Sequence, residues 1–155
     1  MKLAEALILR ADLRKRTERL SERLRRNAKV QEGDDPAERP EALFAELERV
    51  AADLESIIRR VNWTNANLMV DRDHRISDAI AMRDTLDLRI RTMRGVIDEV
   101  SQRERWFTRS EVKFVATVDA SALQKQLDDL SRQRRDLDTR LQAVNWQEDL
   151  LEANY

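Results

Sequence analysis

Residues 43–61, LFAELERVAADLESIIRRV, decide the fold of this 155-residue chain. Their apolar side chains recur at alternating spacings of three and four, which is the pattern of an α-helix that buries one face. The predicted buried stripe is Leu43, Leu47, Val50, Leu54, Ile57 and Val61, widened by Phe44, Ala51 and Ile58. A stripe of that width is typical of a helix inside a bundle. We therefore predict a helix over residues 40–66, with Pro40 in the first turn, where its missing N–H costs nothing.

Three other segments carry a narrower stripe with a period near 3.5, which predicts helices over residues 2–28, 77–104 and 120–146. The three stripes are Leu3, Ala6, Arg10, Leu13, Thr17, Leu20 and Leu24; Ile76, Ala79, Arg83, Leu86, Ile90, Met93, Ile97 and Val100; and Leu123, Leu127, Leu130, Arg134, Leu137, Leu141 and Val144. Two glycines and two prolines leave too little turn material for an all-β fold. We predict an all-α fold: one domain, residues 1–155, in which four long antiparallel helices form a bundle with coiled-coil-like packing.

The segments between the helices contain turn and cap signals and one strand-like pattern. Gly33 and the residues up to Pro36 break the first connection, and Asp119 or Ser121 caps the fourth helix. Between the third and fourth helices, residues 111–118 alternate between apolar and polar side chains, with Val115 as the exception, which predicts a short β-ribbon within residues 108–118. Residues 68–70 form a weaker candidate for a second strand.

Charge changes sign from one helix to the next. Residues 1–29 contain ten Lys or Arg and four Asp or Glu, a net charge of +6, whereas residues 30–58 contain two and nine, a net charge of −7. Residues 59–110 contain eleven basic and eight acidic residues, a net charge of +3. Residues 111–155 contain six basic and nine acidic residues, a net charge of −3. We expect neighbouring helices to complement each other in charge, which selects the pairing more than it adds stability.

Three of the four stripes contain an arginine where an apolar residue is expected: Arg10, Arg83 and Arg134. A buried guanidinium needs a carboxylate or a bound anion beside it, unless its stem carries the charge out to water. Acids within the chain, a second subunit or a small anionic ligand are the alternatives for that partner. Capping of the helix end is the first explanation for Asn62 and Asn65. The alternative is that these two residues, which share one helical face, join Arg83 in a polar ligand site.

An aromatic and basic cluster precedes the fourth helix. Its members, with one tryptophan from the end of that helix, are the candidate interface Trp106, Phe107, Arg109, Lys113, Phe114 and Trp146. Aromatic residues beside arginine are frequent anchors of protein interfaces, and the same chemistry can stack nucleic-acid bases. We favour a protein interface because the calculated isoelectric point, about 6.0, is far from that of a basic nucleic-acid-binding domain.

Catalytic and cofactor motifs are missing from the sequence. Without cysteine, disulfides, thiolate metal sites and cysteine nucleophiles are excluded. The single histidine, His74, lies between Asp73 and Arg75 in a polar connection that we interpret as a solvated turn and not as a metal site. There is no glycine-rich phosphate loop, and no apolar run is long enough for a membrane span or a signal peptide. We expect a cytoplasmic protein that is not an enzyme and binds no cofactor, metal or membrane.

Five stretches spread over the chain point to a family. They are KLAEAL at 2–7, NAKVQEGD at 27–34, NWTNA at 62–66, RSEVKFVATVD at 109–119 and VNW at 144–146. Together they resemble a family of small, uncharacterised, mainly helical bacterial proteins, some of which carry the name septicolysin. The resemblance implies a helical fold and brings no established activity. The charged outer faces of the helices argue against the lytic activity that this name suggests, because a pore former must expose apolar surface to lipid.

The function we predict is that of a non-enzymatic structural or interaction protein that assembles into a homo-oligomer. Narrow stripes on long helices bury little area, so apolar side chains such as Trp146 and Tyr155 need a further partner. Two alternatives stay open. One is a binding module for a small anionic ligand through the seam arginines, and the other is nucleic-acid binding through the basic first helix and residues 103–113.

Overall fold

The structure, a computed structural model, describes residues 1–101 and 115–152. It contains the helices α1 (Leu3–Asn27), α2 (Pro40–Asn67), α3 (Ile76–Ser101) and α4 (Ala120–Gln147). Every helix start, and the ends of α1, α2 and α4, lie within one residue of the prediction. The predicted last turn of the third helix, residues 102–104, lies outside the described residues. The all-α prediction is confirmed.

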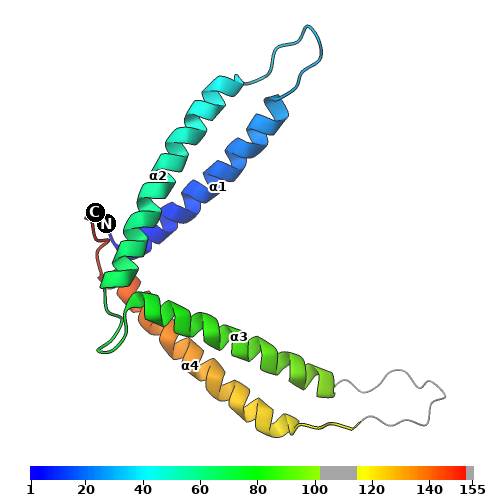
Figure 1. Cartoon of the computed structure of the whole chain (residues 1–155), viewed down its shortest axis with the longest axis vertical. Helices are drawn as coiled ribbons and strands as arrows, with labels where there is room; N and C mark the ends of the chain where they lie inside the picture. Colours follow the sequence, from blue (N-terminus) through cyan, green and yellow to red (C-terminus); the bar gives the residue numbers. More distant parts are fainter. Residues whose placement is uncertain (102–114, 153–155) are drawn as a thin grey trace, which may run out of the picture. The chain divides into compact units, whose positions relative to one another are not determined.

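The chain divides into two compact units. The first consists of Met1–Met69 and the chain from Gln142 onward, and the second of Val70–Leu141. α1 and α2 lie side by side in the first unit, and α3 and the main part of α4 lie side by side in the second (Figure 1). That all four helices form a single bundle stays a prediction.

In the first unit, α1 and α2 meet along the predicted stripes. The buried apolar residues of α1 are Leu3, Ala4, Ala6, Leu13 and Leu20, and those of α2 are Leu43, Val50, Ile57 and Val61. The predicted widening of the α2 stripe is wrong at two positions, because Phe44 is 55% exposed and Ala51 is exposed as well. A helix that packs against one neighbour covers a single narrow seam, so its second apolar face stays at the surface.

The second unit has a seam of the same kind. α3 buries Ile76, Ala79, Leu86 and Ile90, and α4 buries Leu127, Leu130, Leu137 and Leu141. These residues follow the predicted period near 3.5, which confirms the two stripes.

Local signals place the helix ends where the sequence suggests. Pro40 is at the first position of α2, and Gly33 adopts a positive φ of 94° in the connection before it, a conformation that glycine tolerates best. Asp119 is the cap of α4, since its Oδ1 accepts hydrogen bonds from the N–H groups of Ser121 (2.9 Å) and Ala122 (3.1 Å). Of the two candidates for this cap, Asp119 is therefore confirmed.

The predicted β-ribbon is not supported. Residues 115–118 of the segment 108–118 are not a strand, and residues 108–114 lie outside the described part of the chain. Val115 is 81% exposed, so this part of the alternating pattern has no core against which a strand could pack. In the weaker candidate, residues 68–70, Met69 takes part in a single β-bridge and the N–H of Val70 donates to the carbonyl of His74 (2.9 Å), but these three residues form no strand.

β-like pairing occurs instead where the two ends of the chain meet, which the sequence analysis missed. Lys2 and Asp149 form an isolated antiparallel bridge. The N–H of Leu3 donates to the carbonyl of Glu148 (3.0 Å), and the N–H of Leu150 donates to the carbonyl of Met1 (2.9 Å). Leu150 is buried beneath this pairing. We call residues 1–3 and 148–152 the terminal clasp.

Thr64 ties the terminal clasp to α2. Its side chain is completely buried. Among the residues that the structure describes, no other polar side chain is buried. The Oγ1 hydroxyl donates to the carbonyl of Arg60 (2.8 Å) and accepts the N–H of Leu151 (3.0 Å). Arg60 also pairs with Glu152 at 2.6 Å. The C-terminal segment is thus fastened to α2 by one buried hydroxyl and one ion pair.

Candidate functional site

Arg134 finds its partners within the chain. Its Nε donates to Asp87 Oδ1 on α3 (3.1 Å), and its Nη1 lies 3.5 Å from Asp138 Oδ2, one turn farther along α4. The guanidinium is only partly covered, with 35% of the side chain exposed. The sequence leaves open whether acids of the same chain, a second subunit or a ligand pair with this arginine. In the structure, carboxylates of the same chain do so.

The other two seam arginines differ from Arg134. Arg83 donates through Nη2 to Asp84 Oδ1 (3.1 Å), the next residue along α3, so this ion pair joins no two elements. Arg10 is half-buried on α1 and has no hydrogen bond or ion pair to the residues that the structure describes. Intermediate burial without such a partner is what a long cationic side chain adopts when its stem is covered and its charge reaches solvent.

The remaining predicted site residues are not brought together within one unit. Asn62 is exposed and Asn65 half-buried on α2 in the first unit, whereas Arg83 belongs to the second. Their cluster therefore stays a prediction. Of the candidate interface, Trp106, Phe107, Arg109, Lys113 and Phe114 lie outside the described residues. Trp146 is 57% exposed near the end of α4.

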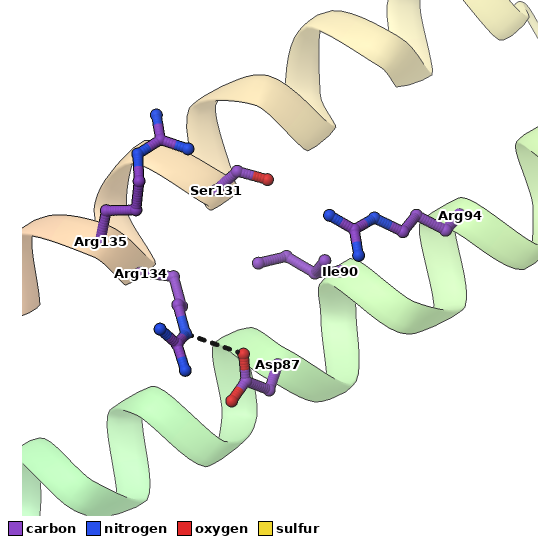
Figure 2. A pocket seen from close by; sticks show the side chains of 6 residues that line it. All are labelled: Asp87, Ile90, Arg94, Ser131, Arg134 and Arg135. Atoms are coloured by element: carbon purple, nitrogen blue, oxygen red, sulfur yellow. Dashed lines mark hydrogen bonds and ion pairs between the residues drawn. The ribbon is translucent and has the colours of Figure 1, made fainter. Parts of the chain in front are cut away.

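A hollow that the sequence did not indicate lies between α3 and α4 within the second unit. It has a volume of about 300 Å³ and is lined by Asp87, Ile90, Arg94, Ser131, Arg134 and Arg135 (Figure 2). Ile90 is buried at its base, and the guanidinium of Arg94 extends from α3 towards α4. An adjoining hollow shares Asp87, Ile90 and Arg94. Three arginines, Arg94, Arg134 and Arg135, thus line one small hollow.

Only part of this positive charge is neutralised. Arg134 is paired with Asp87 and Asp138. Arg94 and Arg135 are both exposed, and neither guanidinium bonds to a carboxylate among residues 1–101 and 115–152. The i,i+3 and i,i+4 spacings of Ser131, Arg134 and Arg135 explain why these three residues share one stretch of α4. Arg94 and Arg135 lie beside the predicted apolar stripes and not in them, so the periodicity of the sequence does not indicate them.

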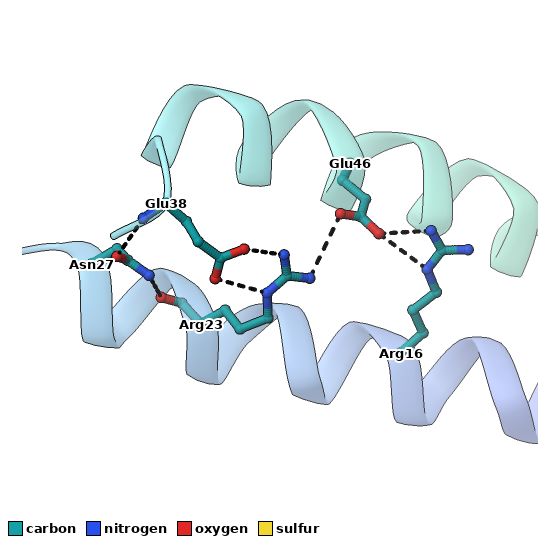
Figure 3. A network of polar contacts seen from close by, with 5 residues as sticks. All are labelled: Arg16, Arg23, Asn27, Glu38 and Glu46. Atoms are coloured by element: carbon teal, nitrogen blue, oxygen red, sulfur yellow. Dashed lines mark hydrogen bonds and ion pairs between the residues drawn. The ribbon is translucent and has the colours of Figure 1, made fainter. Parts of the chain in front are cut away.

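α1 and α2 are joined by the ion pairs that their opposite charges predict (Figure 3). Arg16 bonds to Glu46 through Nη2 (2.6 Å), and Arg23 bonds to Glu38 and approaches Glu46 to 3.7 Å. Asn27 accepts the N–H of Glu38 at 3.0 Å. The predicted complementarity between the first two helices is confirmed, and the register of the contacts shows that these helices are antiparallel.

Hydrogen bonding within this network lowers the pKa of two carboxyl groups. The bond from Arg23 lowers the pKa of Glu38 below its ordinary value, and the bond from Arg16 does the same to the pKa of Glu46. Both carboxylates are ionised at neutral pH. Glu46 joins α1 to α2, and Glu38 joins α1 to the connection just before α2. We assign this network a structural role, since all its members are satisfied by one another.

The turn that contains His74 is organised by Asp71. The Asp71 carboxylate accepts the N–H groups of Asp73 (3.0 Å) and His74 (2.9 Å) and lies 2.9 Å from His74 Nδ1. Its second oxygen accepts from Arg140 Nη1 on α4 at 3.1 Å. The N–H of Asp73, together with the His74 ring, lowers the pKa of Asp71. The polar connection is therefore a turn that the Asp71 carboxylate holds together and links to α4.

Replacing Asp71 with asparagine is expected to lower the urea midpoint of unfolding at pH 7. Because the folded-state pKa of Asp71 is depressed, its stabilising effect is present above the unfolded value of about 3.9 and is lost as pH falls through the lower folded value. The difference between the wild-type protein and Asp71→Asn should therefore disappear in the acid range below about pH 4. Asp73→Asn serves as the matched control, since no side-chain bond of Asp73 is involved. An equal loss in both variants would refute the role of Asp71.

Two general features bear on function. Among residues 1–101 and 115–152, no three His, Asp or Glu side chains lie close enough together to hold a metal ion. In the same part of the chain, no helix combines the length and apolar character that a membrane span requires.

Comparison with known proteins places the chain in a family. A crystal structure of a conserved protein of unknown function from Corynebacterium diphtheriae is 36% identical, with a TM-score of 0.92, and the match covers 97% of this chain and 99% of that one. No curated protein matches. Residues 10–150 match the model of a family described only as of unknown function, DUF6847, and nothing in these comparisons supports the name septicolysin. The chain therefore belongs to the family of unknown function DUF6847.

Proposed function

We propose that the protein is a non-enzymatic interaction protein that assembles into a homo-oligomer. The observation that carries this proposal is the apolar surface left outside the α1–α2 seam. Phe44 is 55% exposed, Ala51 is exposed and Ile58 is half-buried. These three residues, which we call the α2 outer stripe, are spaced by seven and therefore lie on one face of the helix. The spacing is that of the buried seam, so the stripe suits a further helix.

Charge favours a second copy of this chain as the partner. The exposed acids Glu41, Glu48 and Glu55 flank the α2 outer stripe. The outward face of α1 presents the exposed bases Lys15, Arg19 and Arg26. The two faces are complementary in charge, as the paired faces of the same two helices are within one chain. Contact between the α1 face of one copy and the α2 outer stripe of the next would join different surfaces, which generates a ring or a filament.

Light scattering coupled to size exclusion, at about 10 μM protein, tests the assembly. We expect the wild-type protein to be larger than a monomer and Phe44→Glu to weaken association about tenfold or more, because the apolar contact of the ring is lost and a carboxylate must be desolvated in its place. Leu88→Glu is the matched control, since Leu88 is 58% exposed on α3 and belongs to the other unit. It should assemble as the wild type does.

Two outcomes would contradict the proposal. A monomeric wild-type protein at this concentration would exclude self-assembly. Unchanged assembly of Phe44→Glu would exclude the α2 outer stripe as the contact surface. Circular dichroism of each variant shows whether the helices are retained.

A further inference from the structure

The hollow between α3 and α4 combines features that a phosphate group requires. Arg94 lines it from α3, and Arg135 and Ser131 line it from α4 (Figure 2). Guanidinium groups donate several hydrogen bonds in a fixed planar arrangement that matches the oxygens of phosphate, and a hydroxyl can donate one more. The donors are therefore supplied by three side chains on two rigid elements.

The acidic residue in the hollow does not cancel this charge. Asp87 is engaged by Arg134 at 3.1 Å, and Asp138 lies at 3.5 Å from the same guanidinium. Arg134 is consequently held in place by two carboxylates, while Arg94 and Arg135 keep their charge without a carboxylate partner in the described chain. Two like charges beside one concave surface repel each other, and a bound dianion would relieve this repulsion.

We propose that this hollow binds the phosphate group of a small phosphorylated ligand through Arg94, Arg135 and Ser131. The volume of about 300 Å³ is at the small end of ligand pockets, which favours a compact phosphate compound over a large cofactor. The base of the hollow is the buried side chain of Ile90, which offers an apolar surface to the rest of the ligand. The site differs from the predicted seam-arginine site, because the guanidinium of Arg134 is already paired and acts as a fixed wall.

Titration calorimetry with inorganic phosphate, in a buffer of low and constant ionic strength, tests the proposal. We expect the double variant Arg94→Gln/Arg135→Gln to bind phosphate at least about tenfold more weakly than the wild type, because charge-assisted hydrogen bonds are lost from both sides of the hollow. Ser131→Ala should weaken binding by a smaller factor, since it removes one neutral donor.

Arg89→Gln/Arg132→Gln is the matched control for charge. It also removes one exposed arginine from α3 and one from α4, and neither residue lines the hollow. We expect its phosphate affinity to equal that of the wild type. Absence of phosphate binding to the wild type would overturn the proposal, as would equal losses in the two double variants, which would show that only the overall charge matters. Because the hollow and the α2 outer stripe belong to different units, failure of this test leaves the light-scattering result for self-assembly unaffected.

Discussion

Leu20→Ala is expected to destabilise the protein by about 2–5 kcal/mol, which is the usual cost of removing three buried carbon atoms and leaving a cavity. Leu20 is 1% exposed and lies in the α1–α2 seam. A two-helix seam has one layer of buried side chains, so no second layer can move in to fill the space. Urea unfolding at 25 °C, followed by circular dichroism at 222 nm, measures the change in the free energy of unfolding.

Ile8→Ala is the control for this prediction. Ile8 is on the same helix and is 54% exposed, so its truncation should change the free energy of unfolding by less than about 0.5 kcal/mol. The comparison separates loss of packing from a change in helix propensity. If both variants were equally stable, the assignment of Leu20 to the core of the first unit would be wrong.

Thr64→Val is expected to cost about 1–3 kcal/mol, although the two side chains have nearly the same shape. The substitution leaves the N–H of Leu151 without its acceptor, because the Oγ1 of Thr64 receives that bond at 3.0 Å in a completely buried position. The loss should appear first in the terminal clasp. Amide hydrogen exchange at Leu150 and Leu151, together with the urea midpoint, provides the two measurements.

Thr64→Ser keeps the hydroxyl and removes one methyl group, so it separates the hydrogen bond from the packing. We expect Thr64→Ser to retain the slow exchange of the Leu151 amide that Thr64→Val loses. Faster exchange of this amide in the serine variant than in the valine variant would contradict the role assigned to the hydroxyl.

The helices could be predicted from the sequence because their signal is local. The period near 3.5 in residues such as Leu13, Leu20 and Leu127 depends only on the geometry of one helix, and so do the start at Pro40 and the cap at Asp119. The ion pairs between α1 and α2 were also predictable in kind, since helices of opposite net charge attract wherever they meet. Which arginine meets which glutamate depends on the register between the two helices. The net charge of each helix carries no information about that register.

The errors have a common physical cause. The width of the α2 stripe does not say how many neighbours cover it, so Phe44 was predicted to be buried although it is exposed. The alternating pattern before the fourth helix does not show whether a partner strand is present. Val115 is exposed and has no partner among the described residues against which a strand could pack. In both cases a pattern within one segment was interpreted as evidence for a second segment beside it.

Helix content, helix bounds and the buried seams thus follow from short-range periodicity, which is set by backbone geometry and by the exclusion of apolar side chains from water. The terminal clasp, the pairing of Arg134 with Asp87 and the hollow around Arg94 and Arg135 depend on residues that are far apart in the chain. In the bonds Arg134 to Asp87 and Lys2 to Gln147, the separations are 47 and 145 positions. Such contacts are decided only when helices pack in one register, because a shift of a single turn brings different side chains together.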